Sequence, residues 1–144
     1  MKLQVALDSD FSLDRALRVI ETVQESIDIV EIGTPFVLAE GLSVVRGVKQ
    51  RFPHLPVLAD LKIMDAGEYE AGLAFAAGAD LVTALAAADD QTIRGALTAA
   101  RAHGGELVVD MIAVPDLPQR LAEIDALSVD YLCLHTSKDL QKLR

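Results

Sequence analysis

The 144-residue chain is poor in several residue types, and each shortage excludes a class of protein. Its single cysteine, Cys133, rules out an internal disulfide and a cysteine-rich zinc site. Tryptophan is missing, and the aromatic side chains amount to four phenylalanines and two tyrosines. Basic residues are also scarce, since 13 Lys and Arg stand against 22 Asp and Glu, for a net charge of -9. Nucleic acid and anionic membranes attract basic surfaces, so neither is an expected partner.

Long apolar runs are missing as well. No stretch is long and apolar enough to span a bilayer, and the first residues lead directly into a strand pattern rather than into the apolar core of a signal peptide. We therefore expect a cytoplasmic protein. With 51% hydrophobic residues, the chain can bury a sizeable core, and we expect one domain over residues 1–144.

Short β-branched runs alternate with segments whose apolar residues recur every three or four positions, which is typical of alternating strands and helices. The predicted strands are Leu3–Asp8, Ile27–Gly33, Val57–Lys62, Leu81–Leu85, Leu107–Ile112 and Tyr131–His135. The predicted helices between them are Leu13–Glu25, Ala39–Arg51, Glu68–Ala77, Gln91–His103 and Leu117–Leu127. Repeated units of this kind build a parallel sheet, either open or closed into a barrel.

The ends of the strands favour the barrel. In a doubly wound sheet both faces of a strand are apolar, whereas here one face turns polar at the C-terminal end of successive strands. The residues concerned are Asp8, Glu31, Asp60 with Lys62, Asp110 and His135. No glycine-rich phosphate loop follows the first strand, which speaks against a nucleotide-binding sheet. The predicted fold is α/β, of the (β/α)8 TIM-barrel type, truncated to about six βα units.

The segment Asp60–Asp65 stands out, because two acids flank a lysine at the end of an apolar run. Residues two apart in a regular strand share a face, so Asp60 and Lys62 are expected to point the same way. Burying a lone ion costs several kcal/mol, roughly, unless it is paired or bound. The pair must therefore compensate each other or serve a ligand.

Taken together, these motifs make the chain resemble the 3-hexulose-6-phosphate synthases, a family within the orotidine 5'-monophosphate decarboxylase suprafamily. The resemblance runs over essentially the whole chain. It rests on segments Val5–Asp8, Glu31–Pro35, Ala59–Gly67, Ala79–Thr83, Val108–Ile112 and His135–Thr136. Proteins of this family join formaldehyde to D-ribulose 5-phosphate, reversibly, and use a magnesium ion. The resemblance implies the same aldolase reaction through a magnesium-stabilised enediolate.

The resemblance also implies roles for individual residues. Glu31 and Asp60 would hold the magnesium ion, Lys62 would face the enediolate oxygen and His135 would be the base. These roles suit the chemistry, because charge builds on oxygen when the proton next to the carbonyl is removed.

Further implied roles concern the substrate and a second copy of the chain. Asp8 and Asp110 would position substrate hydroxyls. Asp65 would reach across an interface into the partner's site, which implies a homodimer with shared active sites.

Alternatives remain open for these residues. Asp60 and Lys62 could form a structural ion pair, Asp65 could cap the helix that follows it, and His135 could be a satisfied core residue. Cys133, below His135 on the same face, is expected to be inert core.

The function has two alternatives. Lys138 occupies the position of a functional arginine in 3-keto-L-gulonate 6-phosphate decarboxylases, which keeps that activity open. A closed barrel needs two further βα units, whose loops usually grip the substrate phosphate. Without them the first and last strands become unpaired edges, and a catalytically inactive dimerising scaffold stays possible. The chain could be a fragment, a short natural form or one completed by a partner.

Overall fold

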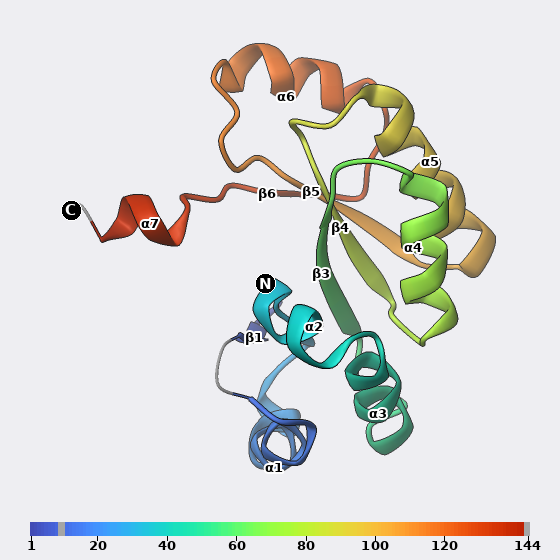
Figure 1. Cartoon of the computed structure of the whole chain (residues 1–144), viewed down its shortest axis with the longest axis vertical. Coiled ribbons are helices and arrows are strands. Elements are labelled where there is room, and N and C mark those ends of the chain that lie inside the picture. The colour runs from blue at the N-terminus through green and yellow to red at the C-terminus, as the bar shows by residue number, and fades with distance from the viewer. Residues whose placement is uncertain (9–10, 143–144) are drawn as a thin grey trace.

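Six parallel strands form a single curled sheet in the order β1-β2-β3-β4-β5-β6. The structure is a computed structural model that describes residues 1–8 and 11–142. Helices lie along the outer side of the sheet, which wraps around as an incomplete barrel (Figure 1). The elements are β1 (Gln4–Leu7), α1 (Leu13–Val23), the short 3₁₀ helix η1 (Gln24–Ser26), β2 (Ile29–Ile32), α2 (Thr34–Glu40), α3 (Ser43–Arg51), β3 (Val57–Ile63), α4 (Gly67–Ala76), β4 (Leu81–Leu85), α5 (Asp90–His103), β5 (Glu106–Asp110), α6 (Leu117–Asp125), β6 (Tyr131–Cys133) and α7 (Lys138–Gln141). The predicted fold class is confirmed, and so is the count of six strands within the described residues.

Alternation along the strands divides the apolar residues into two sets. The larger set packs between the outer side of the sheet and the helices, and includes Val30, Ile63 and Leu107. The smaller set points to the inner side and forms a separate cluster of Ile29, Leu58, Leu81 and Val108. Two residues further along the same strands, the inner side turns polar. There it carries Glu31, Asp60, Thr83 and Asp110.

Helices α4 and α5 approach closely because glycine lies at their contact. A Cβ atom added at Gly67 would lie 1.9 Å from the carbonyl oxygen of Thr92, and one added at Gly95 would lie 2.9 Å from the amide nitrogen of Glu68. Neither position can accept a side chain without moving a helix. This packing fixes the start of α4, and with it the loop that follows β3.

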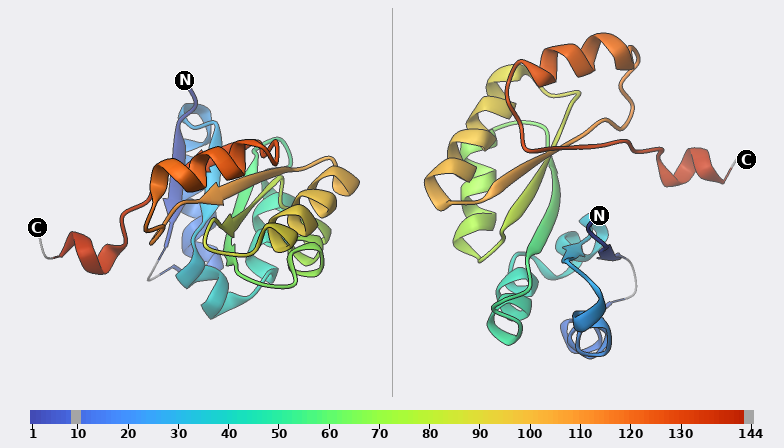
Figure 2. Two further views of the ribbon diagram at one scale, coloured as in Figure 1. Left: turned by 90° about the horizontal axis from the view of Figure 1, so that it is seen from above. Right: turned by 180° about the vertical axis from the view of Figure 1, so that it is seen from behind.

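The predicted helix Ala39–Arg51 is wrong as a single element. The structure has α2 and α3 instead, and Gly41 between them adopts φ 68° and ψ -172°. This conformation belongs to glycine, so the apolar periodicity continues across a break in the backbone. The short helix α7 was not predicted. It stands off from the rest of the molecule in all three ribbon views (Figures 1 and 2).

Strands β1 and β6 are the edges of the sheet, as expected from the strand count. Two contacts between side chains cross the opening: Lys2 Nζ lies 3.3 Å from the Tyr131 hydroxyl oxygen, and Lys138 donates to Asp8 at 2.5 Å. The prediction that Cys133 is inert core is wrong, because Cys133 is exposed. The reason is its place on an edge strand, with no neighbour beyond it. Within the described residues, no helix has the length and apolar character needed to cross a membrane.

Candidate active site

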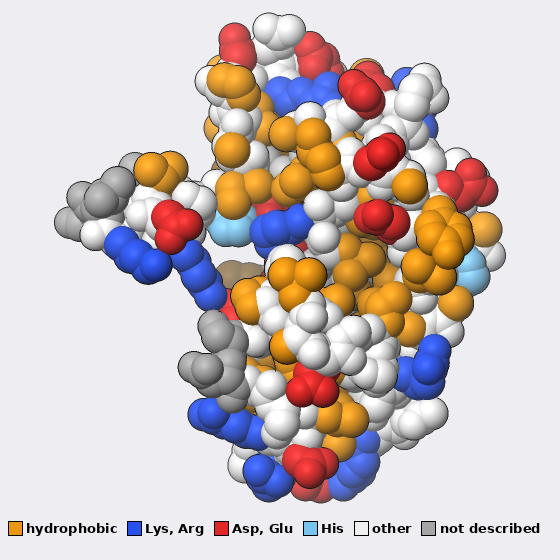
Figure 3. Space-filling view, viewed as in Figure 1, with side chains coloured by type: hydrophobic (Ala, Val, Ile, Leu, Met, Phe, Trp, Pro, Cys, Tyr) orange, Lys and Arg blue, Asp and Glu red, His pale blue; other side chains and the backbone are white. Residues whose placement is uncertain are grey.

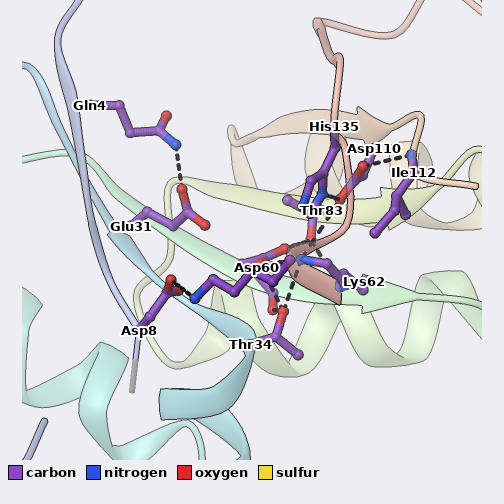
Figure 4. Close-up of polar contacts among 11 residues, drawn as sticks. Gln4, Asp8, Glu31, Thr34, Asp60, Lys62, Thr83, Asp110, Ile112 and His135 are labelled. Atoms are coloured by element: carbon purple, nitrogen blue, oxygen red, sulfur yellow. Dashed lines mark hydrogen bonds and ion pairs between the residues drawn. The ribbon is translucent and has the colours of Figure 1, made fainter. Parts of the chain in front are cut away.

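A cavity of about 870 Å³ opens on the inner side of the sheet, toward the C-terminal ends of the strands. The space-filling view shows a hollow between α7 and the body of the molecule (Figure 3). Side chains from all six strands and from the segments after β1, β2, β5 and β6 line the cavity. They include six of the seven predicted site residues, namely Asp8, Glu31, Asp60, Lys62, Asp110 and His135. The expectation that these strand ends converge is therefore met (Figure 4).

Asp60 is the most heavily bonded carboxylate in the cavity. Its Oδ1 accepts a hydrogen bond from Thr83 at 2.7 Å, and its Oδ2 accepts one from Thr34 at 2.7 Å and another from Lys62. Burial alone would raise the pKa of Asp60, but the hydrogen bonds from Lys62 and the two threonines outweigh it and lower the pKa. Asp60 is therefore ionised at neutral pH although only 6% of it is exposed.

Lys62 occupies an unusual backbone position. Its φ is 51°, in the left-handed region, and the pairing of β3 with β4 shifts register between Ala59 and Ile63. The ammonium contacts Asp60, lies 3.1 Å from the Thr34 hydroxyl and 3.7 Å from Asp110 Oδ2. Burial would lower the pKa of Lys62, yet the neighbouring carboxylates, Asp60 first, raise it. Lys62 therefore carries a full positive charge between two acids.

Asp110 and His135 form a second polar pair. His135 Nδ1 lies 2.8 Å from Asp110 Oδ2, while Asp110 Oδ1 accepts the backbone N–H of Ile112 at 2.9 Å. An ionised carboxylate only accepts, so Nδ1 carries a proton in this pair. In the neutral tautomer that this contact selects, Nε2 holds the lone pair. The sequence assigned Asp110 to substrate hydroxyls, but its nearest partner in the structure is the histidine.

Glu31 lies on β2, beside Asp60 on β3. Gln4 donates to Glu31 Oε2 at 2.6 Å from the edge strand β1. Burial, and next the charge of Asp60, raise the pKa of Glu31 above its ordinary value. The two carboxylates therefore repel each other across one part of the cavity, where a cation would relieve the repulsion.

No cluster of three or more His, Cys, Asp and Glu side chains suited to a metal occurs among residues 1–8 and 11–142. Magnesium does not need one, because it is commonly held by one or two carboxylates together with water and substrate oxygens. Glu31 and Asp60 supply two such hard oxygen donors on neighbouring strands. Their chemistry fits magnesium, and their role as its ligands stays a prediction.

Asp65 is the predicted site residue that the structure keeps out of this cavity. Its side chain is exposed, and Oδ1 accepts the backbone N–H of Ala66 at 2.7 Å. Ala66 adopts φ 50° and precedes the first turn of α4. Within one chain, Asp65 thus stabilises a turn. Its action in a partner's site remains a prediction.

Sequence reasoning missed three residues that contact the predicted ones. Thr34 and Thr83 bond Asp60, and Gln4 bonds Glu31. A signal was present for Thr83 and Gln4, since each is a polar residue in phase with the inward positions of its strand. Thr34 begins α2, and nothing in the pattern indicated that its hydroxyl turns back to β3.

Known proteins resemble the chain over nearly its whole length. The family model described as "Orotidine 5'-phosphate decarboxylase / HUMPS family" matches residues 1–143. A 3-hexulose-6-phosphate synthase from Bacillus subtilis is 52% identical over 98% of this chain and 67% of its own length.

Solved structures agree. The structure of 3-hexulose-6-phosphate synthase from Salmonella typhimurium superimposes with a TM-score of 0.95 and 44% identity, over 99% of this chain and 67% of that one. A 3-keto-L-gulonate-6-phosphate decarboxylase from Vibrio cholerae gives a TM-score of 0.89 with 29% identity, over 99% and 65% of the two chains. The chain spans about two thirds of the length of these relatives, and it belongs to the orotidine 5'-phosphate decarboxylase / HUMPS family.

Proposed function

We propose that this chain carries the aldolase site of a 3-hexulose-6-phosphate synthase, which condenses formaldehyde with D-ribulose 5-phosphate. One observation supports the proposal above the others. A charged lysine lies between two acids, and one of these acids orients a histidine in the same cavity. Proton removal next to a carbonyl needs a base and a cation facing one substrate, and this arrangement provides both.

The residues divide the reaction between them. Asp110 holds Nδ1–H of His135, so Nε2 takes the proton from the carbon next to the ketone. The Lys62 ammonium faces the oxygen on which charge then develops. The enediolate carbon attacks the carbon of formaldehyde, a new C–C bond forms, and the formaldehyde oxygen receives a proton from His135. Base and ammonium return to their starting states.

The proposal includes magnesium between Glu31 and Asp60. Bound there, the ion would chelate substrate oxygens and stabilise their negative charge. Gln4 orients Glu31, and the two threonines orient Asp60, so both carboxylates are held before any cation binds. Asp8, at the rim beside Lys138, is proposed to contact a substrate hydroxyl.

We also propose a cytoplasmic homodimer with shared active sites. In it, Asp65 of each chain would enter the other chain's cavity. The support is the exposure of Asp65 together with that of Met64 and Tyr69, which are near it in the sequence and are 53% and 70% exposed.

A second candidate is decarboxylation of a keto-gulonate phosphate. The decarboxylase from Vibrio cholerae shares the fold at 29% identity, and Lys138 lines the cavity of this chain. The higher identity to synthases, 52% against 29%, places this activity second.

The test measures both activities on the same sample. The chain is mixed with ribulose 5-phosphate, formaldehyde and magnesium, and loss of formaldehyde is followed with and without a chelator. We expect magnesium-dependent loss that disappears in Lys62→Ala and persists in Lys142→Ala, a control on an exposed lysine of the same type. Release of carbon dioxide from the keto-gulonate phosphate without formaldehyde loss would favour the decarboxylase. If the chain shows neither activity and does not bind sugar phosphate in the presence of magnesium, the result would favour the catalytically inactive scaffold.

A further inference from the structure

Thr83 donates one hydrogen bond and accepts another inside the cavity. Its Oγ1 lies 2.7 Å from Asp60 Oδ1 and 2.9 Å from the backbone nitrogen of Lys62, and only 5% of the residue is exposed. A backbone N–H only donates and an ionised carboxylate only accepts. The hydroxyl therefore accepts from Lys62 and donates its one proton to Asp60. Both directions are fixed by chemistry alone.

The contact with Lys62 lies where the sheet is irregular. Between Ala59 and Ile63, strand β3 runs four residues while β4 advances by two, from Val82 to Ala84. Inside this bulge the N–H of Lys62 is bonded to a side chain of β4. A left-handed backbone at a residue with a side chain is strained and persists only where its surroundings hold it. The Thr83 hydroxyl is the group that holds it here.

The bulge decides where the ammonium goes. Bulges re-aim side chains, so the backbone angles of Lys62 set where on the Asp60 face its ammonium lies. With φ at 51°, the side chain contacts Asp60 and its Nζ comes within 3.7 Å of Asp110 Oδ2. The same hydroxyl also fixes Asp60 Oδ1, so one group sets the positions of both members of the pair.

We propose that Thr83 is a positioning residue, whose hydroxyl clamps the bulge of β3 so that the Lys62 ammonium lies between Asp60 and Asp110. The proposal rests on the proposed function, because the placement of the ammonium matters only for a reacting oxygen. Thr83 itself takes no part in bond making.

The experiment compares three variants of the chain. Thr83→Val keeps the branched shape and removes the hydroxyl, Thr83→Ser keeps the hydroxyl, and Thr98→Val makes the same change on the exposed side of α5, where Thr98 bonds a helix carbonyl. The first readout is structural: the exchange rate of the Lys62 amide hydrogen, and the HN–Hα coupling of Lys62, which reports its φ. The second readout is kinetic: kcat and KM for formaldehyde addition to ribulose 5-phosphate.

In Thr83→Val we expect the Lys62 amide to exchange about 10-fold faster, since it loses one hydrogen bond, and its coupling to move toward the extended value. We expect kcat to fall by about 10- to 100-fold with KM within about twofold, because the reacting groups are misplaced while the sugar phosphate still binds. Thr83→Ser should restore both readouts, and Thr98→Val should change neither.

Each other result counts against the inference. An unchanged Lys62 amide in Thr83→Val shows that the hydroxyl does not hold the bulge, whatever the activity. A changed amide with unchanged kcat removes the positioning role, and so does a Ser variant as slow as Val. If the parent chain itself does not turn over, the proposed function fails, and the exchange and coupling data still decide whether Thr83 clamps Lys62.

Discussion

The Asp110 carboxylate lies 2.8 Å from His135 Nδ1, and 2% of Asp110 is exposed to solvent. A buried acid bonded in this way fixes both the ring orientation and the tautomer of a histidine. The base of the proposed reaction is thereby built from β5, which carries Asp110, and from the segment after β6, which carries His135.

Replacing Asp110 by asparagine should lower kcat by about 100-fold or more, because the amide no longer enforces a proton on Nδ1. Formaldehyde consumption measures the effect, and circular dichroism checks the fold. The matched control is Asp139→Asn on α7, whose carboxylate is 92% exposed and should tolerate the change. Equal rates in Asp110→Asn and the parent chain would show that Asp110 does not orient the base.

Glu31 is expected to lower the stability of the folded chain while it supports magnesium binding. Burial, followed by the charge of Asp60, raises the pKa of Glu31 above 4.5, so the folded state is destabilised by an ionised Glu31 at pH values above that. Glu31→Gln is expected to unfold at a higher temperature than the parent chain at pH 7, with the gap closing as the pH falls through the raised pKa of Glu31 and absent below 4.5. The stabilisation that magnesium gives the parent should be lost. A Gln variant still stabilised by magnesium would argue against Glu31 as a ligand.

Asp130 gives a pH-dependent contribution away from the cavity. Burial opposes its charge, but the Arg101 guanidinium and the N–H of Leu107 outweigh this and lower its pKa below 3.8. Its contribution is therefore complete above pH 3.8 and is lost as the pH falls through that value toward the folded pKa. Asp130→Asn should lower the unfolding free energy by about 1 kcal/mol at pH 7, because it weakens one hydrogen bond that solvent partly screens. In strong acid the variant and the parent chain should be equally stable. Urea unfolding at both pH values tests this, and a loss independent of pH would contradict it.

The edge strand β6 should drive association of the chain. Leu132 on β6 and Leu134 just after it are 43% and 72% exposed at the unpaired edge of the sheet, and such edges pair with other strands. At high concentration, the double variant Leu132→Lys and Leu134→Lys should sediment as a smaller species than the parent chain. Leu38→Lys on α2, at 81% exposed, is the matched control. Identical sedimentation of the double variant and the parent would show that the edge at β6 does not drive association.

Much of the candidate site follows from simple periodicity. Because side chains alternate along a strand and parallel strands end at one rim, Asp8, Glu31, Asp60 and Asp110 had to meet once six strands paired in order. The exposure of Cys133 was missed, although the strand count already predicted that its strand is an edge of the sheet. The break at Gly41 did not follow from periodicity, since apolar spacing is continuous across it.

The sequence by itself determined the alternation of strands and helices, the inward face of each strand and the acids that line it, because these depend on local periods of two and 3.6 residues. Only the tertiary structure decided which of these groups bond. It set Lys62 in a left-handed bulge held by Thr83, turned Asp110 to His135 and kept Asp65 at the surface. Such pairings depend on the register between strands and on backbone angles at single residues, and neither leaves a trace in the pattern of residue types.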